Sequence, residues 1–79
     1  MAPMPTYTLC AQFEIKDETG KIITESCTTT LECRDLADAQ KQLDVQISEK
    51  IGHFSAKGWY WTLTEKVIKR ANDKRAFIF

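Results

Sequence analysis

The sequence contains little of what most catalytic and ligand-binding motifs require. It has a single histidine, His53, and its three glycines, Gly20, Gly52 and Gly58, stand far apart. A loop that cradles phosphate groups needs several glycines close together, so this class of site is not expected. A domain of 79 residues also has little volume for the usual ligand pocket. These features predict a protein that is not an enzyme and that uses no cofactor.

Cysteines are few and irregularly placed. Cys10, Cys27 and Cys33 form an odd set, which argues against a secreted framework of disulfides. A closed zinc site uses paired ligands a few residues apart, and the spacing of these cysteines and His53 differs from that pattern. We therefore predict three reduced, partly buried thiols and no metal site. His53 is predicted to be a surface residue near the end of a helix.

Long hydrophobic runs are also lacking. No run approaches the roughly 20 residues of a membrane-spanning helix, and the first ten residues, MAPMPTYTLC, do not have the pattern of a secretory signal. We therefore expect a cytoplasmic protein without a membrane partner. The apolar fraction of 43% and the charged fraction of 28% are ordinary for a globular protein. We predict one domain over residues 1–79, in which residues 1–5 form a flexible tail.

Charges sum to zero, with 11 of each sign, but they are unevenly distributed. Residues 1–49 contain nine acidic and four basic side chains, whereas residues 50–79 contain two acidic and seven basic ones. A basic region of this kind can bind nucleic acid or an acidic protein, or the two regions can pair with each other across the fold.

Two alternating segments near the N-terminus predict a β-hairpin. Residues 6–15 and 22–34 place apolar side chains at every second position, as in half-buried strands. Between them, Gly20 can supply the positive φ of a bulged turn and Asp17 can bond to its own backbone. The register that brings the apolar faces together pairs Ile15 with Ile23, Ala11 with Cys27 and Tyr7 with Leu31.

A helix is predicted after this hairpin. Asp35 is a suitable N-cap residue, and Asp38 adds a negative charge to the first turn. One apolar stripe follows the helical period: Leu36, Ala39, Leu43, Ile47, Ile51 and Phe54. Gly52 is predicted to end the helix, and Val45 is predicted to be a lone exposed apolar residue on the opposite side.

The segment GWYWTLTEKVIKR, residues 58–70, predicts a third strand. Its alternation directs Trp59, Trp61, Leu63 and Val67 toward the helix, and Tyr60, Thr62, Thr64, Lys66 and Ile68 away from it. After a turn at residues 71–74, the segment RAFIF predicts a short last strand. The expected fold is therefore an α+β two-layer sandwich of order ββαββ, with a four-stranded antiparallel sheet and one helix on one face.

The face of the sheet away from the helix is predicted to be polar and nearly neutral. It would present Thr8, Cys10, Gln12, Glu14, Thr24, Ser26, Thr28 and Thr30 from the hairpin, and Tyr60, Thr62, Thr64 and Lys66 from the third strand. Such a face is either an ordinary solvated sheet surface or a recognition surface for protein.

We expect the function of a small non-enzymatic protein-binding module that uses this open face and the basic C-terminal hairpin. The predicted partner-binding residues are Tyr60, Lys66, Lys69, Arg70, Lys74 and Arg75. Two alternatives stay open: a nucleic-acid-binding module that uses the same hairpin, and a self-associating structural protein such as a homodimer. In size and architecture alone, the chain resembles the small accessory proteins of phages and mobile elements, including inhibitors of host defence complexes.

Overall fold

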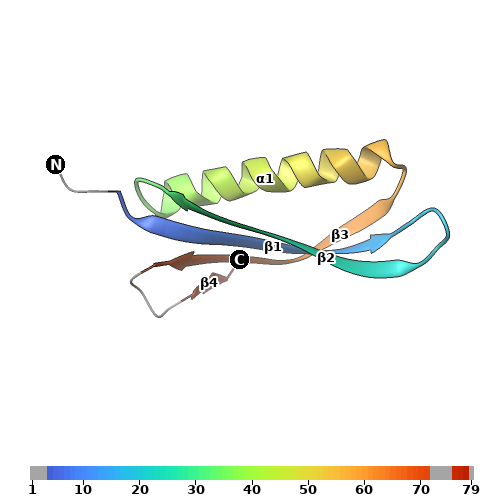
Figure 1. Ribbon diagram of the computed structural model, residues 1–79, viewed down its shortest axis with the longest axis horizontal. Helices are drawn as coiled ribbons and strands as arrows, with labels where there is room; N and C mark the ends of the chain where they lie inside the picture. Colours follow the sequence, from blue (N-terminus) through green and yellow to red (C-terminus); the bar gives the residue numbers. More distant parts are fainter. Residues whose placement is uncertain (1–3, 72–75, 79) are drawn as a thin grey trace.

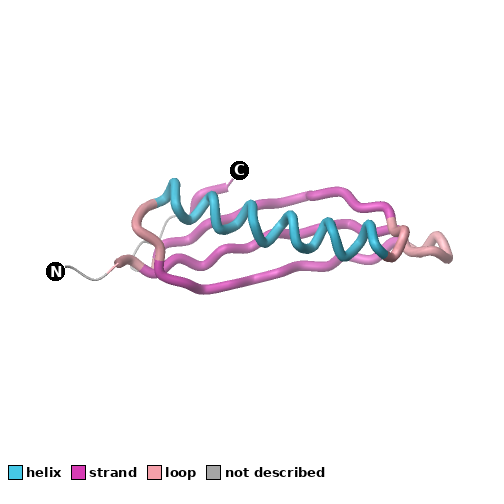
Figure 2. Tube along the Cα trace, turned by 90° about the horizontal axis from the view of Figure 1, so that it is seen from above, coloured by secondary structure: helices cyan, strands magenta, loops and turns pink. Residues whose placement is uncertain are grey.

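The computed structural model describes residues 4–71 and, for the backbone, residues 76–78. Its elements in chain order are β1 (Thr6–Lys16), β2 (Ile22–Glu32), α1 (Leu36–Ala56), β3 (Tyr60–Arg70) and β4 (Ala76–Ile78). The strands are antiparallel in the order β2-β1-β3-β4, and α1 lies along one face of the sheet (Figures 1 and 2). The molecule is elongated, with extents of 52 × 22 × 15 Å. Within the described residues, no helix is long and apolar enough to span a membrane.

The expected ββαββ sandwich of four antiparallel strands needs a correction at its C-terminal end. Three strands of 11 residues each, β2-β1-β3, form the antiparallel sheet that carries the helix, so the body of the fold is a ββαβ unit. The segment β4 contributes three residues, whose backbone pairs only with Val67–Lys69. It is short because the apolar run after residue 75 is far shorter than the alternating runs that form the other strands.

The first hairpin forms in the predicted register. Ile15 lies opposite Ile23, and the pairing continues without interruption from Lys16 and Ile22 to Thr6 and Glu32. Its turn is closed by Gly20, whose φ is +85°, and by Asp17, whose Oδ1 atom accepts hydrogen bonds from the backbone N–H groups at positions 19 and 21. Both expectations for this turn are confirmed, because the hydrogen bonds that form it are local in the chain.

The helix begins as predicted but ends later. Asp35 is its N-cap, and its Oδ1 atom accepts a 2.8 Å hydrogen bond from the backbone N–H of Asp38. The prediction that Gly52 ends the helix is wrong, because α1 continues for another turn and Gly58, with φ +73°, follows the C-cap residue Lys57. This extra turn buries Phe54, and a positive-φ glycine just after the helix is the common way to end it.

A β-bulge in β3 reverses part of the predicted alternation. Leu63 lies opposite Phe13, but Glu65 lies opposite Gln12, so Thr64 is an extra residue. Before the bulge the prediction holds, and Trp61 and Leu63 lie on the helix side. After the bulge it is wrong for three residues: Lys66 and Ile68 lie on the helix side, and Val67 lies on the open face. Since side chains alternate with a period of two, one inserted residue exchanges the two faces.

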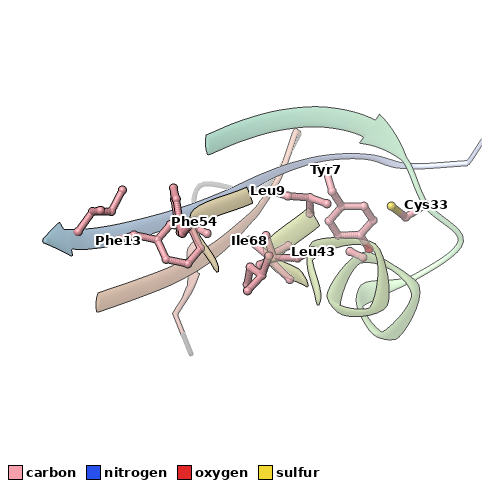
Figure 3. Close-up of a cluster of buried hydrophobic side chains, with 11 residues drawn as sticks. Tyr7, Leu9, Phe13, Cys33, Leu43, Phe54 and Ile68 are labelled. Carbon is pink, nitrogen blue, oxygen red and sulfur yellow. The ribbon is translucent and has the colours of Figure 1, made fainter. Parts of the chain in front are cut away.

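The core lies between α1 and the strands β1 and β3 (Figure 3). It comprises Tyr7, Leu9, Ala11, Phe13, Ile15, Cys33, Ala39, Leu43, Ile47, Phe54 and Ile68. Phe13 is fully buried, with the ring of Phe54 edge-on at 5.3 Å and the ring of Trp61 edge-on at 6.5 Å between centroids. Four residues of the predicted helical stripe therefore belong to the core, Leu36 and Ile51 pack against it half-buried, and Val45 is exposed as expected. By contrast, no residue of β2 is fully buried.

Candidate functional site

The central part of the open face, on the side of the sheet away from α1, is formed by three rows of side chains across β2, β1 and β3. The registers place Ser26, Gln12 and Glu65 in one row, Thr28, Cys10 and Val67 in the next, and Thr30, Thr8 and Lys69 in the third. Most of these groups are neutral hydroxyl, amide or thiol groups. The predicted composition of this face is therefore confirmed for β1 and β2 and for Tyr60 and Thr62 of β3, and corrected for the residues of β3 after the bulge.

A shallow hollow lies at the centre of the open face. It has a volume of about 320 Å³ and is lined by Cys10, Ala11, Gln12, Ser26, Thr28, Glu65 and Val67. Cys10 and Val67 are half-buried, whereas Ser26 and Thr28 on β2 are exposed. The hollow therefore offers a partly apolar centre with hydrogen-bonding groups around it.

Three hydroxyl groups and one thiol group on this face form pairs between neighbouring strands. Oγ1 of Thr8 and Oγ1 of Thr30 are 3.2 Å apart, and Sγ of Cys10 lies 3.5 Å from Oγ1 of Thr28. These cross-strand pairs orient the side chains while leaving each hydroxyl with further capacity to donate or accept.

A second hollow, of about 210 Å³, lies at the end of the open face near the first hairpin turn. Lys16 stands here between Ile22 on one side and Tyr60 on the other. The side chains of Ile22 and Tyr60 are 67% and 77% exposed, which is unusually high for apolar residues of this size. Sequence reasoning identified Tyr60 but missed Ile22, which could have been found from the predicted register, because that register extends to Lys16 and Ile22.

The predicted partner-binding residues do not form one cluster. Tyr60 begins β3, whereas Lys69 and Arg70 end it. At the usual rise per residue the two ends are about 30 Å apart. Lys69 lies on the open face. Arg70 is exposed on the helix side of the sheet, where it pairs across the strands with Tyr7.

The other predicted cations differ in their placement. Lys66 lies on the helix side because of the bulge, where its Nζ atom is 3.6 Å from Oδ1 of Asp44 on α1. Lys74 and Arg75 lie outside the described residues.

Sequence reasoning also missed Glu65 and Val67 on the open face. The signal was present: Glu65 interrupts an apolar alternation at a position that would otherwise point to the core, and a β-bulge removes this conflict.

The three consecutive aromatic residues divide between the two faces of the sheet. Trp61 packs on Phe13 at the end of the core, and Tyr60 faces away from the helix, toward solvent. Trp59 is half-buried beside the first hairpin, where its Nε1–H donates a hydrogen bond to Glu18 and the Nζ atom of Lys57 lies 4.4 Å from its ring centroid. The two tryptophan rings therefore pack at one end of the fold, and the three rings do not form a common stacking platform.

Among the described residues, Asp17 and Cys33 have pKa values displaced by local structure. The Thr19 hydroxyl donates a 2.6 Å hydrogen bond to Oδ1 of Asp17 and lowers the pKa of that carboxyl group. Burial raises the pKa of the Cys33 thiol, and the carboxylates of Asp38 and Asp35 add to this effect. These shifts result from a turn and from the core, so neither points to a catalytic centre. His53 is exposed at the end of α1, as predicted.

The cysteines and acidic residues are dispersed. All three thiols are free, with Cys33 buried and Cys10 and Cys27 half-buried. In the part of the chain that the structure describes, no three His, Cys, Asp or Glu side chains are grouped so that they could hold a metal ion. Comparison of the chain with protein-family models, with curated proteins and with solved structures found no match.

Proposed function

We propose that the protein is a non-enzymatic protein-binding module whose contact surface is the open face of the sheet. The observation that supports this most strongly is the central hollow of about 320 Å³, in which Cys10 and Val67 are surrounded by hydroxyl and amide groups. A concave surface with a partly apolar centre and a polar rim can accommodate a protruding side chain or loop of another protein. The exposed Ile22 and Tyr60 extend the apolar contact toward one end of the face.

The distribution of charge favours protein over nucleic acid as the partner. Binding to a phosphate backbone depends on several cations that act together. Lys66 is paired with Asp44 on the helix side, and Lys69 shares the open face with Glu65 and Glu14. Among the described residues, the nucleic-acid alternative therefore keeps Lys69 and Arg70 at the end of β3 as its basic surface, without Lys66.

An inhibitory role is an extension of this proposal. By covering a surface that the bound protein uses for another interaction, such a module would act as a competitor. This extension rests on the likeness in size and architecture to phage-type inhibitors.

A matched pair of arginine substitutions tests the proposal. Gln12→Arg adds a long cation to the central strand at the hollow, and Ser48→Arg adds the same side chain on the outer, exposed side of α1. The wild-type protein and both variants would be used as bait for affinity capture from a lysate of the native cell, with and without nuclease. Circular dichroism and the urea midpoint of unfolding would establish that both variants are folded.

The expected result is a captured protein that survives nuclease treatment, persists with Ser48→Arg and is reduced at least about tenfold with Gln12→Arg, since the long arginine side chain, opposite Glu65, would occupy the hollow that the partner is proposed to enter. A captured set that is lost with nuclease would favour the nucleic-acid alternative. Equal capture by both variants would remove the open face from the proposal.

A further inference from the structure

One edge of the sheet is formed by β2, a strand of 11 residues whose outer side pairs with no other described strand. Exposed edges are usually blunted by proline, lysine, a bulge or short length, because an open edge can pair with another strand. β2 reads IITESCTTTLE and has no proline, lysine or register shift, and its one charge on the helix side, Glu25, is paired with Lys50 of α1. The edge is therefore suited to pairing with a further strand.

The helix-facing side of β2 is also incompletely covered. Ile23, Cys27 and Leu31 are half-buried, although the residues opposite them on β1 are at most 3% exposed. Beside them, a groove of about 520 Å³ separates β2 from α1 and is lined by Cys27, Thr29, Gln46, Glu49, Lys50 and His53. A strand added next to β2 would cover these apolar side chains.

The hydrogen bonds at the two ends of β2 show which of its backbone groups point outward. Asp17 N–H donates to the Lys21 carbonyl and Cys33 N–H donates to the Pro5 carbonyl, both at 3.0 Å. Because hydrogen-bonded and non-hydrogen-bonded pairs alternate in an antiparallel ladder, the odd-numbered residues of β2 bond to β1. The even-numbered residues from Ile22 to Glu32 therefore direct their N–H and C=O groups to the free edge.

We propose that two copies of the chain pair through β2 in antiparallel orientation about a two-fold axis at Cys27. Cys27 is the middle residue of the strand, so this register pairs all 11 residues of one β2 with all 11 of the other. On the helix side, Ile23 of each copy then lies opposite Leu31 of the second copy. On the open face, Ser26 lies opposite Thr28 and Thr24 opposite Thr30.

Full pairing of the two strands and side-chain chemistry together favour this register over a neighbouring symmetric one. An axis at Glu25 would place the two Glu25 carboxylates directly opposite each other, which is destabilising. An axis at Cys27 instead puts Glu25 opposite Thr29, and Glu25 keeps its 3.3 Å ion pair with Lys50 of its own helix. The resulting dimer has a continuous central sheet of order β3-β1-β2-β2-β1-β3 with both helices on one face, and a self-complementary surface of this kind is typical of two-fold homodimers.

A charge exchange tests the register. Thr24 and Thr30 are exposed on the same strand six residues apart, which is too far for them to interact within one copy. Thr24→Lys/Thr30→Lys would place like charges opposite each other at two symmetric pairs, whereas Thr24→Lys/Thr30→Glu would place opposite charges there. The two variants differ only at residue 30, so the second is a matched control for folding.

Sedimentation equilibrium and light scattering over a range of protein concentration would measure the dimer. We expect the wild-type protein to be a dimer. Association of Thr24→Lys/Thr30→Lys should be about tenfold weaker, whereas association of Thr24→Lys/Thr30→Glu should be as strong as that of the wild-type protein or stronger. A monomer at every concentration would overturn the proposal, as would a dimer that responds equally to both variants.

A disulfide between the two copies gives an independent measurement. In the proposed register the two Cys27 residues form a non-hydrogen-bonded pair, whose Cα atoms lie about 4.5 Å apart, within the range of a disulfide. Diamide would oxidise the two thiols, which lose two protons and two electrons and reduce the reagent to its hydrazine. In a Cys10→Ser background we expect a covalent dimer on non-reducing gels that disappears in Cys10→Ser/Cys27→Ser. A dimer in solution that does not cross-link through Cys27 would show that another surface is used and would overturn the β2 register.

Discussion

The side-chain hydroxyl of Thr64 donates a 3.0 Å hydrogen bond to the backbone carbonyl of Gln12 on the neighbouring strand. Thr64 is the extra residue of the bulge in β3, so it has no partner of its own on β1. The contact bridges the point at which the ladder changes register. Because of this change of register, Val67 lies on the open face and Ile68 is buried in the core.

Loss of this contact should destabilise the protein. We expect Thr64→Val to lower the free energy of unfolding by about 0.5–1.5 kcal/mol, the usual contribution of one hydrogen bond. Thr62→Val, on the same strand and also exposed to solvent, is the control and should change the value by less than about 0.5 kcal/mol. Urea unfolding followed by circular dichroism measures both, and equal effects of the two variants would contradict a role for the Thr64 hydroxyl.

The two glycines at the end of α1 should respond in opposite ways to alanine. Gly52 lies inside the helix with no atom within 4 Å of an added Cβ, so Gly52→Ala should stabilise the protein by about 0.5–1 kcal/mol. Gly58 has φ +73° and ends the helix, so Gly58→Ala should destabilise it by about 1 kcal/mol. Thermal and urea unfolding test this pair. Destabilisation by Gly52→Ala would mean that residue 52 is not helical.

The lowered pKa of Asp17 makes the first hairpin sensitive to acid. Because the folded-state pKa lies below the ordinary value of 3.8, the stabilisation from Asp17 is present above pH 3.8 and is lost as the pH falls through the folded pKa. Thr19→Val removes the main cause of the shift. Titration of the Asp17 carboxyl group by NMR should show its pKa rising toward 3.8 in the variant.

Unfolding free energies measured at a series of pH values provide the second check on Asp17. The difference between the wild-type protein and Thr19→Val should be largest at neutral pH and should shrink in acid. A difference that does not depend on pH would show that the Thr19 hydroxyl acts without the Asp17 charge.

Thiol reactivity should follow burial. Cys33 is fully buried and its pKa is raised, so little reactive thiolate is present at neutral pH. Iodoacetamide should therefore modify the half-buried Cys10 well before Cys33 in the native protein, and both should react in urea. Mass spectrometry of the labelled peptides gives the order of modification, and fast native labelling of Cys33 would contradict its place in the core.

Features that depend on neighbouring residues were predictable from the sequence. The Asp17–Gly20 turn and the Asp35 cap are formed by hydrogen bonds over two to four positions. The register of the first hairpin follows from this turn and from the coincidence of the apolar faces. The proposed open face follows from this register for β1 and β2, since alternation continues through both strands.

Other features depended on contacts between distant segments. Gly52 has the chemistry of a helix end, but burial of Phe54 against Phe13 carries the helix past it. The C-terminal hairpin was expected to complete the sheet, but β4 pairs with three residues only. The distance between the predicted partner-binding residues was also decided by tertiary structure, since Tyr60 and Lys69 lie at opposite ends of one extended strand.

The amino-acid sequence by itself determined the hairpin, the helix and the polar character of one sheet face, because turn hydrogen bonds and side-chain periodicity act over a few residues. Only the tertiary structure decided which side chains of β3 lie on that face. The cost of burying Glu65 in the core exceeds the cost of interrupting one ladder, and this balance depends on β1, more than 50 residues earlier in the chain.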